Sequence, residues 1–134
     1  MKSSWQWKHT GLISQFSVPE IIRGIIKRKN LKELADDEAQ KIIDSILVDI
    51  DTRILNGELL VLALDDSYLP EVNQLIRSLN FFVIDAVQLV TAYHATPAFF
   101  LHADNHFNGR EIQEKVVSID IRKPDAEIEI RKVI

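Results

Sequence analysis

The sequence predicts an α/β fold, a three-layer sandwich in which helices cover a mainly parallel central sheet. Three short apolar runs, at 11–16, 59–64 and 98–103, are typical of strands that are buried on both faces. The longer segments between these runs carry apolar residues at helical spacing. Strands that alternate with helices in this way form parallel sheets, because each crossover returns the chain in the same direction.

The helices are expected after and between the apolar runs. The first follows the strand at 11–16 directly and is amphipathic to about Lys29. A longer second helix is expected over about 37–56, where an Asn-Gly pair ends the apolar stripe. A third helix, with a proline in its first turn, covers about 67–79, and a fourth covers about 85–96.

The end of the chain changes from helical to strand-like periodicity. Apolar and polar residues alternate over 117–122 and again over 128–131, with a turn signal at 123–125 between them. This pattern predicts a terminal β-hairpin over 116–134 with one face in solvent.

Composition predicts one domain over residues 1–134, in which 1–10 form an atypical N-terminal segment. The chain has 134 residues, of which 46% are hydrophobic, enough for one core. It has no cysteine, which excludes disulfides and thiolate metal sites, and no apolar run long enough to span a membrane. We therefore expect a soluble cytoplasmic protein. The net charge of -4 means that nucleic-acid binding would need a local basic patch.

Three carboxylates occupy positions where helices begin or strands end. Glu20 opens the first helix directly after a strand, Asp85 opens the fourth helix, and Asp104 follows the apolar run at 98–103. Such positions bring side chains to one edge of a parallel sheet. The sequence therefore predicts a metal cluster of three carboxylates.

Three motifs carry a resemblance to a known family. They are Ser17-x-x-Glu20, Asp85-Ala86-x-x-Leu89-x-x-Ala92 and Ala103-Asp104-x-x-Phe107. With these motifs in this order, residues 11–122 resemble the PIN domain family, which includes the ribonuclease toxins of toxin-antitoxin pairs.

The resemblance implies an endoribonuclease, a hydrolase that cleaves single-stranded RNA with Mg²⁺ or Mn²⁺ and can have an antitoxin protein as partner. Glu20, Asp85 and Asp104 match the family's second, third and fourth acids, which are catalytic metal ligands. Carboxylates suit hard cations, which acidify a water and polarise a phosphoryl oxygen. Arg23 and Lys27 follow Glu20 on nearly the same helix face, where they could position an RNA phosphate or simply face solvent.

The chain departs from the family pattern at two places. The usual first strand, helix and first acid are missing, since residues 1–19 contain no Asp or Glu. Either the protein is divergent and inactive, or the sequence begins late, or a neighbouring chain completes the sheet. In addition, His102 stands where the family commonly has Thr or Ser.

Each predicted ligand also has a structural explanation. Ser17 and Glu20 could form a capping box, Asp85 with Gln88 repeats that pattern, and Asp104 could close an Asx turn at the end of a strand.

Further side chains allow alternative functions. His102, Asp104 and His106 alternate and could bind Zn²⁺ if the backbone were extended. Trp5 and Trp7 could stack on bases or pack against a second copy. The competing hypothesis is therefore a catalytically inactive PIN-like interaction protein that acts as a homodimer.

Overall fold

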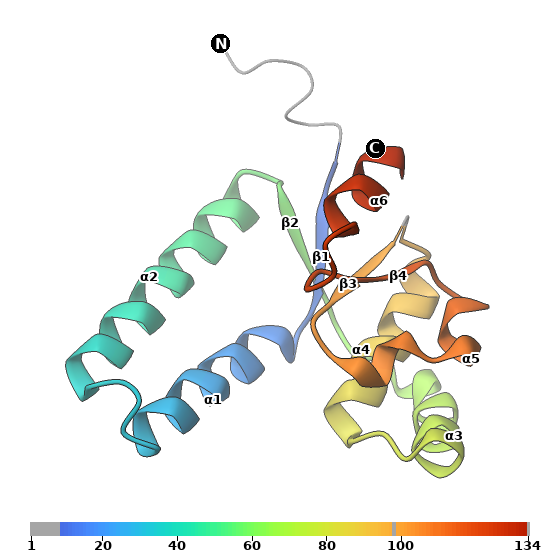
Figure 1. Cartoon of the computed structure of the whole chain (residues 1–134), viewed down its shortest axis with the longest axis horizontal. Coiled ribbons are helices and arrows are strands. Elements are labelled where there is room, and N and C mark those ends of the chain that lie inside the picture. Colours follow the sequence, from blue (N-terminus) through green and yellow to red (C-terminus); the bar gives the residue numbers. More distant parts are fainter. Residues whose placement is uncertain (1–8, 98, 134) are drawn as a thin grey trace. The chain divides into compact units, whose positions relative to one another are not determined.

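The computed structural model describes residues 9–97 and 99–133, which form two compact units with the boundary between Ala63 and Leu64 (Figure 1). Both units are mixed α/β with one short pair of parallel strands, which confirms the coarse fold class. The single domain expected over residues 1–134 stays a prediction. Trp5 and Trp7 lie outside the described residues. None of the described helices combines the length and apolar character needed to cross a membrane.

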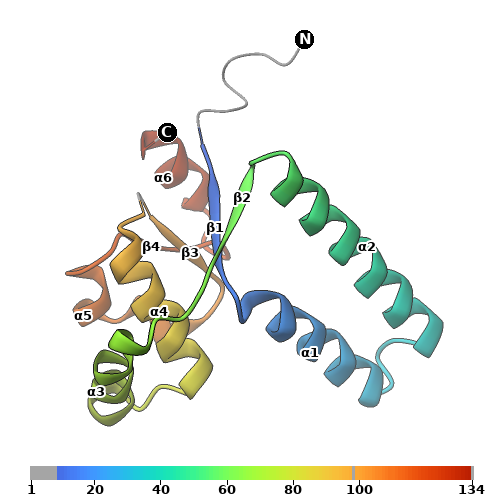
Figure 2. The ribbon, with the colours of Figure 1, turned by 180° about the vertical axis from the view of Figure 1, so that it is seen from behind.

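The first unit is a strand, two helices and a second strand. They are β1 (Gly11–Ser14), α1 (Ser17–Asn30), α2 (Asp36–Leu55) and β2 (Leu59–Leu62). β1 and β2 pair in parallel, with Gly11 opposite Leu59. In both views the two helices meet at the turn that connects them and diverge from there (Figures 1 and 2). Gly57, at φ 72°, supplies the left-handed turn that ends α2. The periodicity thus placed all four elements within a few residues.

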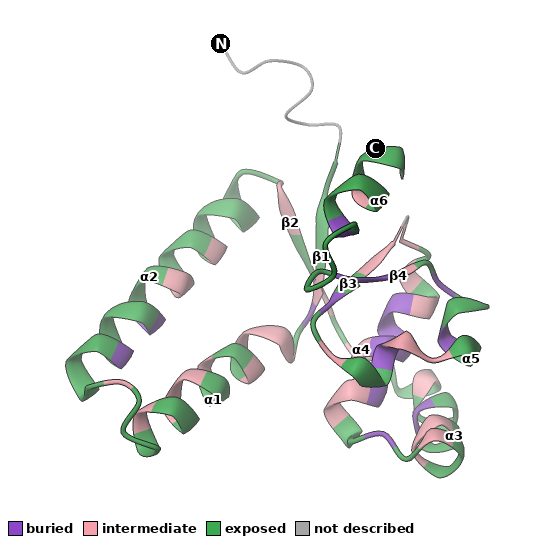
Figure 3. Ribbon diagram, viewed as in Figure 1, coloured by how far each residue is buried: buried purple, intermediate pink, exposed green. Residues whose placement is uncertain are grey.

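The first unit buries few side chains. Among residues 9–63 only Ser14, Ala39 and Ile43 are buried (Figure 3). Its exposed large apolar residues are Leu12, Ile21, Leu31, Ile42, Val48, Ile54, Leu55, Leu60 and Val61. The prediction that these strands are buried on both faces is wrong, because a two-stranded sheet in this unit has no second helical layer to cover it.

The second unit contains more elements around a denser core. They are η2 (Asp66–Tyr68), α3 (Leu69–Leu79), α4 (Val83–Ala95), β3 (Phe100–His102), η3 (Asn105–Asn108), α5 (Arg110–Gln113), β4 (Ser118–Asp120) and α6 (Ala126–Val133). β3 and β4 pair in parallel, with His102 opposite Asp120.

Helix α4 provides the centre of this core. Six of its residues are buried: Ala86, Val87, Leu89, Val90, Thr91 and Ala92 (Figure 3). α4 packs against α3. In the same unit the ring of Phe107 contacts the rings of Phe81 and Phe100, with centroid distances of 5.6 and 5.2 Å. Thr96, at φ 48°, ends the helix just before Pro97.

The predicted β-hairpin over 116–134 is wrong. Only 118–120 form a strand, and β4 pairs in parallel with β3 rather than with a following strand. The segment expected as the second arm forms α6. The alternation at 128–131 covers only four residues, whereas Glu127 and Arg131 form an i,i+4 ion pair of 2.7 Å that favours the helix.

Candidate metal centre

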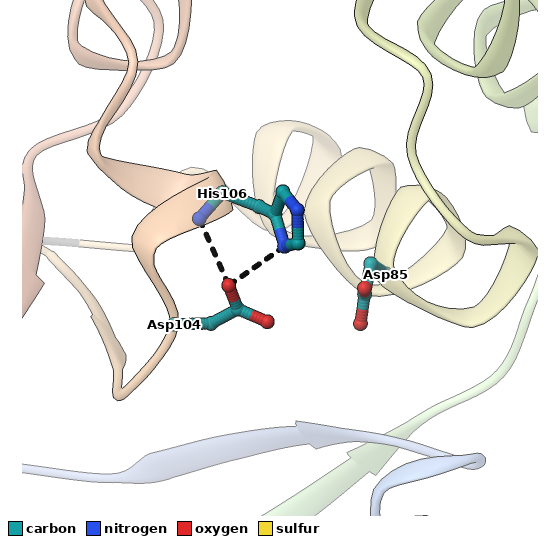
Figure 4. Close-up of side chains that lie close together, drawn as sticks. All are labelled: Asp85, Asp104 and His106. Carbon is teal, nitrogen blue, oxygen red and sulfur yellow. Dashed lines mark hydrogen bonds and ion pairs between the residues drawn. The ribbon is translucent and has the colours of Figure 1, made fainter.

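Asp85, Asp104 and His106 lie together in the second unit (Figure 4). One ligand atom from each side chain lies within 4.8 Å of the others. Two ligands on opposite sides of a divalent ion are separated by about 4.4 Å at ordinary bond lengths. A small inward movement of the side chains would therefore allow all three to bind one ion.

Asp85 lies in the first turn of α4, which begins two residues earlier than expected. Phe82 is the N-cap, so Asp85 is the third helical residue and not the cap. This overturns the explanation of Asp85 as a capping residue. A carboxylate in the first turn lies near the positive end of the helix dipole. The side chain is half-buried.

Asp104 closes a tight turn that also orients His106. Its Oδ1 accepts from the backbone N–H of His106 at 2.8 Å, so the predicted Asx turn is confirmed. The same oxygen lies 2.8 Å from His106 Nδ1. Figure 4 shows the second oxygen of Asp104 on the side that faces Asp85. One carboxylate therefore fixes the imidazole and still offers an oxygen to the cluster.

His102 is not part of this cluster, contrary to the alternating His102-Asp104-His106 hypothesis. β3 ends at His102, and His106 lies in the 3-10 helix η3. The backbone is therefore not extended from 102 to 106, as the alternation would require. His102 is buried against Phe100 and Phe107. Its Nδ1 accepts from the Asp104 N–H at 3.2 Å, while Nε2 has no hydrogen-bond partner among the described residues. The imidazole of His102 thus holds the backbone of Asp104 through this hydrogen bond.

Acidification is expected to destabilise the second unit through His102. Burial lowers the pKa of His102 below its ordinary value of 6.5. Below pH 6.5 His102 therefore binds a proton in the unfolded chain before it does so in the folded chain. The free energy of unfolding is unaffected by this group above pH 6.5 and decreases as the pH falls below that value. Urea unfolding at about pH 7.5 and 5.5 should show this loss, and His102→Gln should reduce it. An unchanged pH dependence in His102→Gln, with exposed His9→Gln as the matched control, would contradict the prediction.

The buried carboxylate of Asp120 forms an ion pair with the exposed Arg122, which the sequence did not predict. Asp120 ends β4, whose carboxyl end lies beside that of β3, and its side chain is only 3% exposed. Hydrogen bonds from Arg122 and Asn108 hold the pKa of Asp120 well below its usual range. The sequence placed Asp120 on the wet face of a hairpin. One signal in the sequence could have indicated a site residue here. Asp120 directly follows the apolar residue Ile119, as Asp104 follows an apolar strand.

The remaining predicted site residues lie on α1 of the first unit. Glu20 and Arg23 form a weak ion pair at 3.9 Å, and Lys27 is exposed in the last turn. The capping-box explanation of Glu20 is wrong, because Phe16 is the N-cap and Ser17 Oγ accepts instead from the Ser14 N–H at 3.1 Å. The participation of Glu20, Arg23 and Lys27 in one site with Asp85 and Asp104 stays a prediction.

No family model, curated protein or solved structure matches this chain.

Proposed function

We propose that the protein is a metal-dependent endoribonuclease of the PIN type that cleaves single-stranded RNA. The observation that supports it is the convergence of Asp85, Asp104 and His106 within coordinating reach. The three-layer sandwich with a mainly parallel sheet, and Glu20 as a third carboxylate ligand, belong to this proposal. Arg23 and Lys27 would then contact the RNA, and an antitoxin protein would be the partner if the enzyme is a toxin.

The donor set favours Mn²⁺ over Mg²⁺. Two carboxylates and one imidazole give mixed oxygen and nitrogen ligands, a set that a transition-metal ion such as Mn²⁺ accepts more readily than Mg²⁺ does. Mg²⁺ prefers oxygen ligands alone. His106 offers a lone pair only when one ring nitrogen is unprotonated, so protons should compete with the metal at low pH.

The side chains have separate roles in this reaction. Asp85 and Asp104 would supply negative oxygen ligands, and the Asx turn would hold Asp104 and His106 in a fixed relation before the metal binds. A bound divalent ion lowers the pKa of a water and stabilises the charge on the phosphate. The rigid strand end and helix start keep the ligands in place, which limits the reorganisation needed for catalysis.

Cleavage of RNA is expected in Mn²⁺, more weakly in Mg²⁺, and not in EDTA. The assay uses the full chain with a mixed pool of single-stranded RNA, and products are separated on a denaturing gel. Mn²⁺ should also raise the thermal unfolding temperature, because an ion that binds only the folded state stabilises it. Stabilisation by Mn²⁺ without RNA cleavage would support a metal site but would refute the proposed ribonuclease activity.

One observation favours a second candidate, an inactive PIN-like protein that acts as a homodimer. The β1–β2 pair exposes Leu12, Leu60 and Val61, with 38%, 51% and 46% of each residue exposed. Parallel sheets are usually covered on both faces, so a second copy could cover these residues. A dimer in light scattering, together with no cleavage in any metal, would favour this candidate over the enzyme.

A further inference from the structure

Arg122 is held in one position beside the candidate metal centre. Its Nε donates to Asp120 Oδ1 at 2.9 Å, and its Nη2 donates to Asp120 Oδ2 at 2.6 Å. The same Nη2 donates to Asn105 Oδ1 at 2.7 Å. Asn105 stands between Asp104 and His106 in the sequence, so the guanidinium lies against the loop that carries two of the three cluster residues.

The buried carboxylate of Asp120 has no acceptor position left for a metal. Oδ1 accepts from the backbone N–H and Nε of Arg122, at 3.0 and 2.9 Å. Oδ2 accepts from Asn108 Nδ2 at 3.0 Å and from Arg122 Nη2. A carboxylate has about four lone-pair sites, and all are used here. Asp120 is therefore a positioning residue for Arg122 and not an additional metal ligand.

The outer edge of the guanidinium remains available to a ligand. No residue in the described part of the chain accepts from Nη1, and the side chain is 47% exposed. Asp120 and Asp104 both raise the pKa of Arg122, so the group stays charged. A planar donor group that is already fixed loses little entropy on binding and matches the geometry of phosphate oxygens.

We propose that Arg122 binds a non-bridging oxygen of an RNA phosphate through Nη1 and so positions the strand at the metal centre. The inference takes RNA as the ligand from the proposed function and adds the residue that holds it. Unlike Arg23 and Lys27, Arg122 belongs to the same unit as Asp85, Asp104 and His106. The structural alternative is that Arg122 only clamps η3 to β4.

RNA binding separates these two roles. Fluorescence anisotropy would follow a labelled oligouridylate of about 12 nucleotides in EDTA, with the full chain and a gel to confirm that the probe is intact. Arg122→Gln is expected to weaken binding about tenfold and to reduce the slope of log affinity against log salt by about 0.7, the loss of one phosphate contact. Arg110→Gln is the matched control, because Arg110 is 91% exposed in the same unit and, among the described residues, forms an ion pair with Glu114 alone.

Arg122→Lys is the variant to measure if Arg122→Gln does not fold. Lysine can still pair with Asp120 but lacks the fork, so weaker binding with a nearly unchanged salt slope is expected. Three results would each overturn the proposal. The Arg122 variant that folds could bind RNA with wild-type affinity, Arg110→Gln could lose as much RNA affinity as the Arg122 variant, or the wild type could fail to bind the RNA. Weakened binding by Arg122→Gln without any Mn²⁺-dependent cleavage in the wild type would retain Arg122 as a phosphate contact and refute the ribonuclease.

Discussion

Asp85→Asn is expected to reduce Mn²⁺-dependent RNA cleavage about 100-fold or more. The substitution keeps the shape of the side chain but replaces an ionised ligand with a neutral amide, which binds hard cations more weakly. Because Asp85 is one of the three candidate ligands in the described part of the chain, the proposed site cannot easily compensate for its loss. Initial rates over a range of Mn²⁺ concentrations measure the effect, and partial recovery at high Mn²⁺ would show that the lost property is metal affinity.

A matched variant separates this effect from a general change of charge. Asp66 is exposed in the same unit and lies outside the cluster, so Asp66→Asn should retain wild-type rates. Unfolding curves of both variants control for loss of structure. Equal cleavage by wild type and Asp85→Asn would show that the activity does not come from this site and would refute the proposed role of Asp85.

Periodicity predicted most of the helices and strands because each long segment has a single dominant pattern. Apolar residues recur at helical spacing along α2, and the run at 59–64 contains β2, so both are placed within a few residues. The segment at 128–131 satisfies a strand pattern over only two repeats, too few to outweigh the helix-stabilising pair of Glu127 and Arg131. Short alternations therefore predict less than long ones.

Only part of the candidate site could be predicted from the sequence. Some of its features depend on local turns, whereas others depend on which distant strands pair. Asp85, in the first turn of α4, and Asp104, two residues after β3, lie close together. His106 was identified from an assumed strand, whereas the Asx turn of Asp104 brings it to the cluster. Asp120 was missed because its role depends on the parallel pairing of β4 with β3, which local alternation cannot distinguish from a hairpin.

Leu89→Ala is expected to lower the free energy of unfolding of the second unit by about 3 kcal/mol. Leu89 is fully buried in α4, so truncation leaves a cavity as well as losing apolar burial. Urea unfolding followed by hydrogen exchange of the backbone amides of α4 reports on this unit. Leu69→Ala, at a residue 42% exposed on α3, is the control and should cost less. Leu89 lies one turn after Asp85 in α4. A loss in Leu89→Ala no larger than in Leu69→Ala would therefore also contradict the view that this core holds the candidate ligand Asp85 in place.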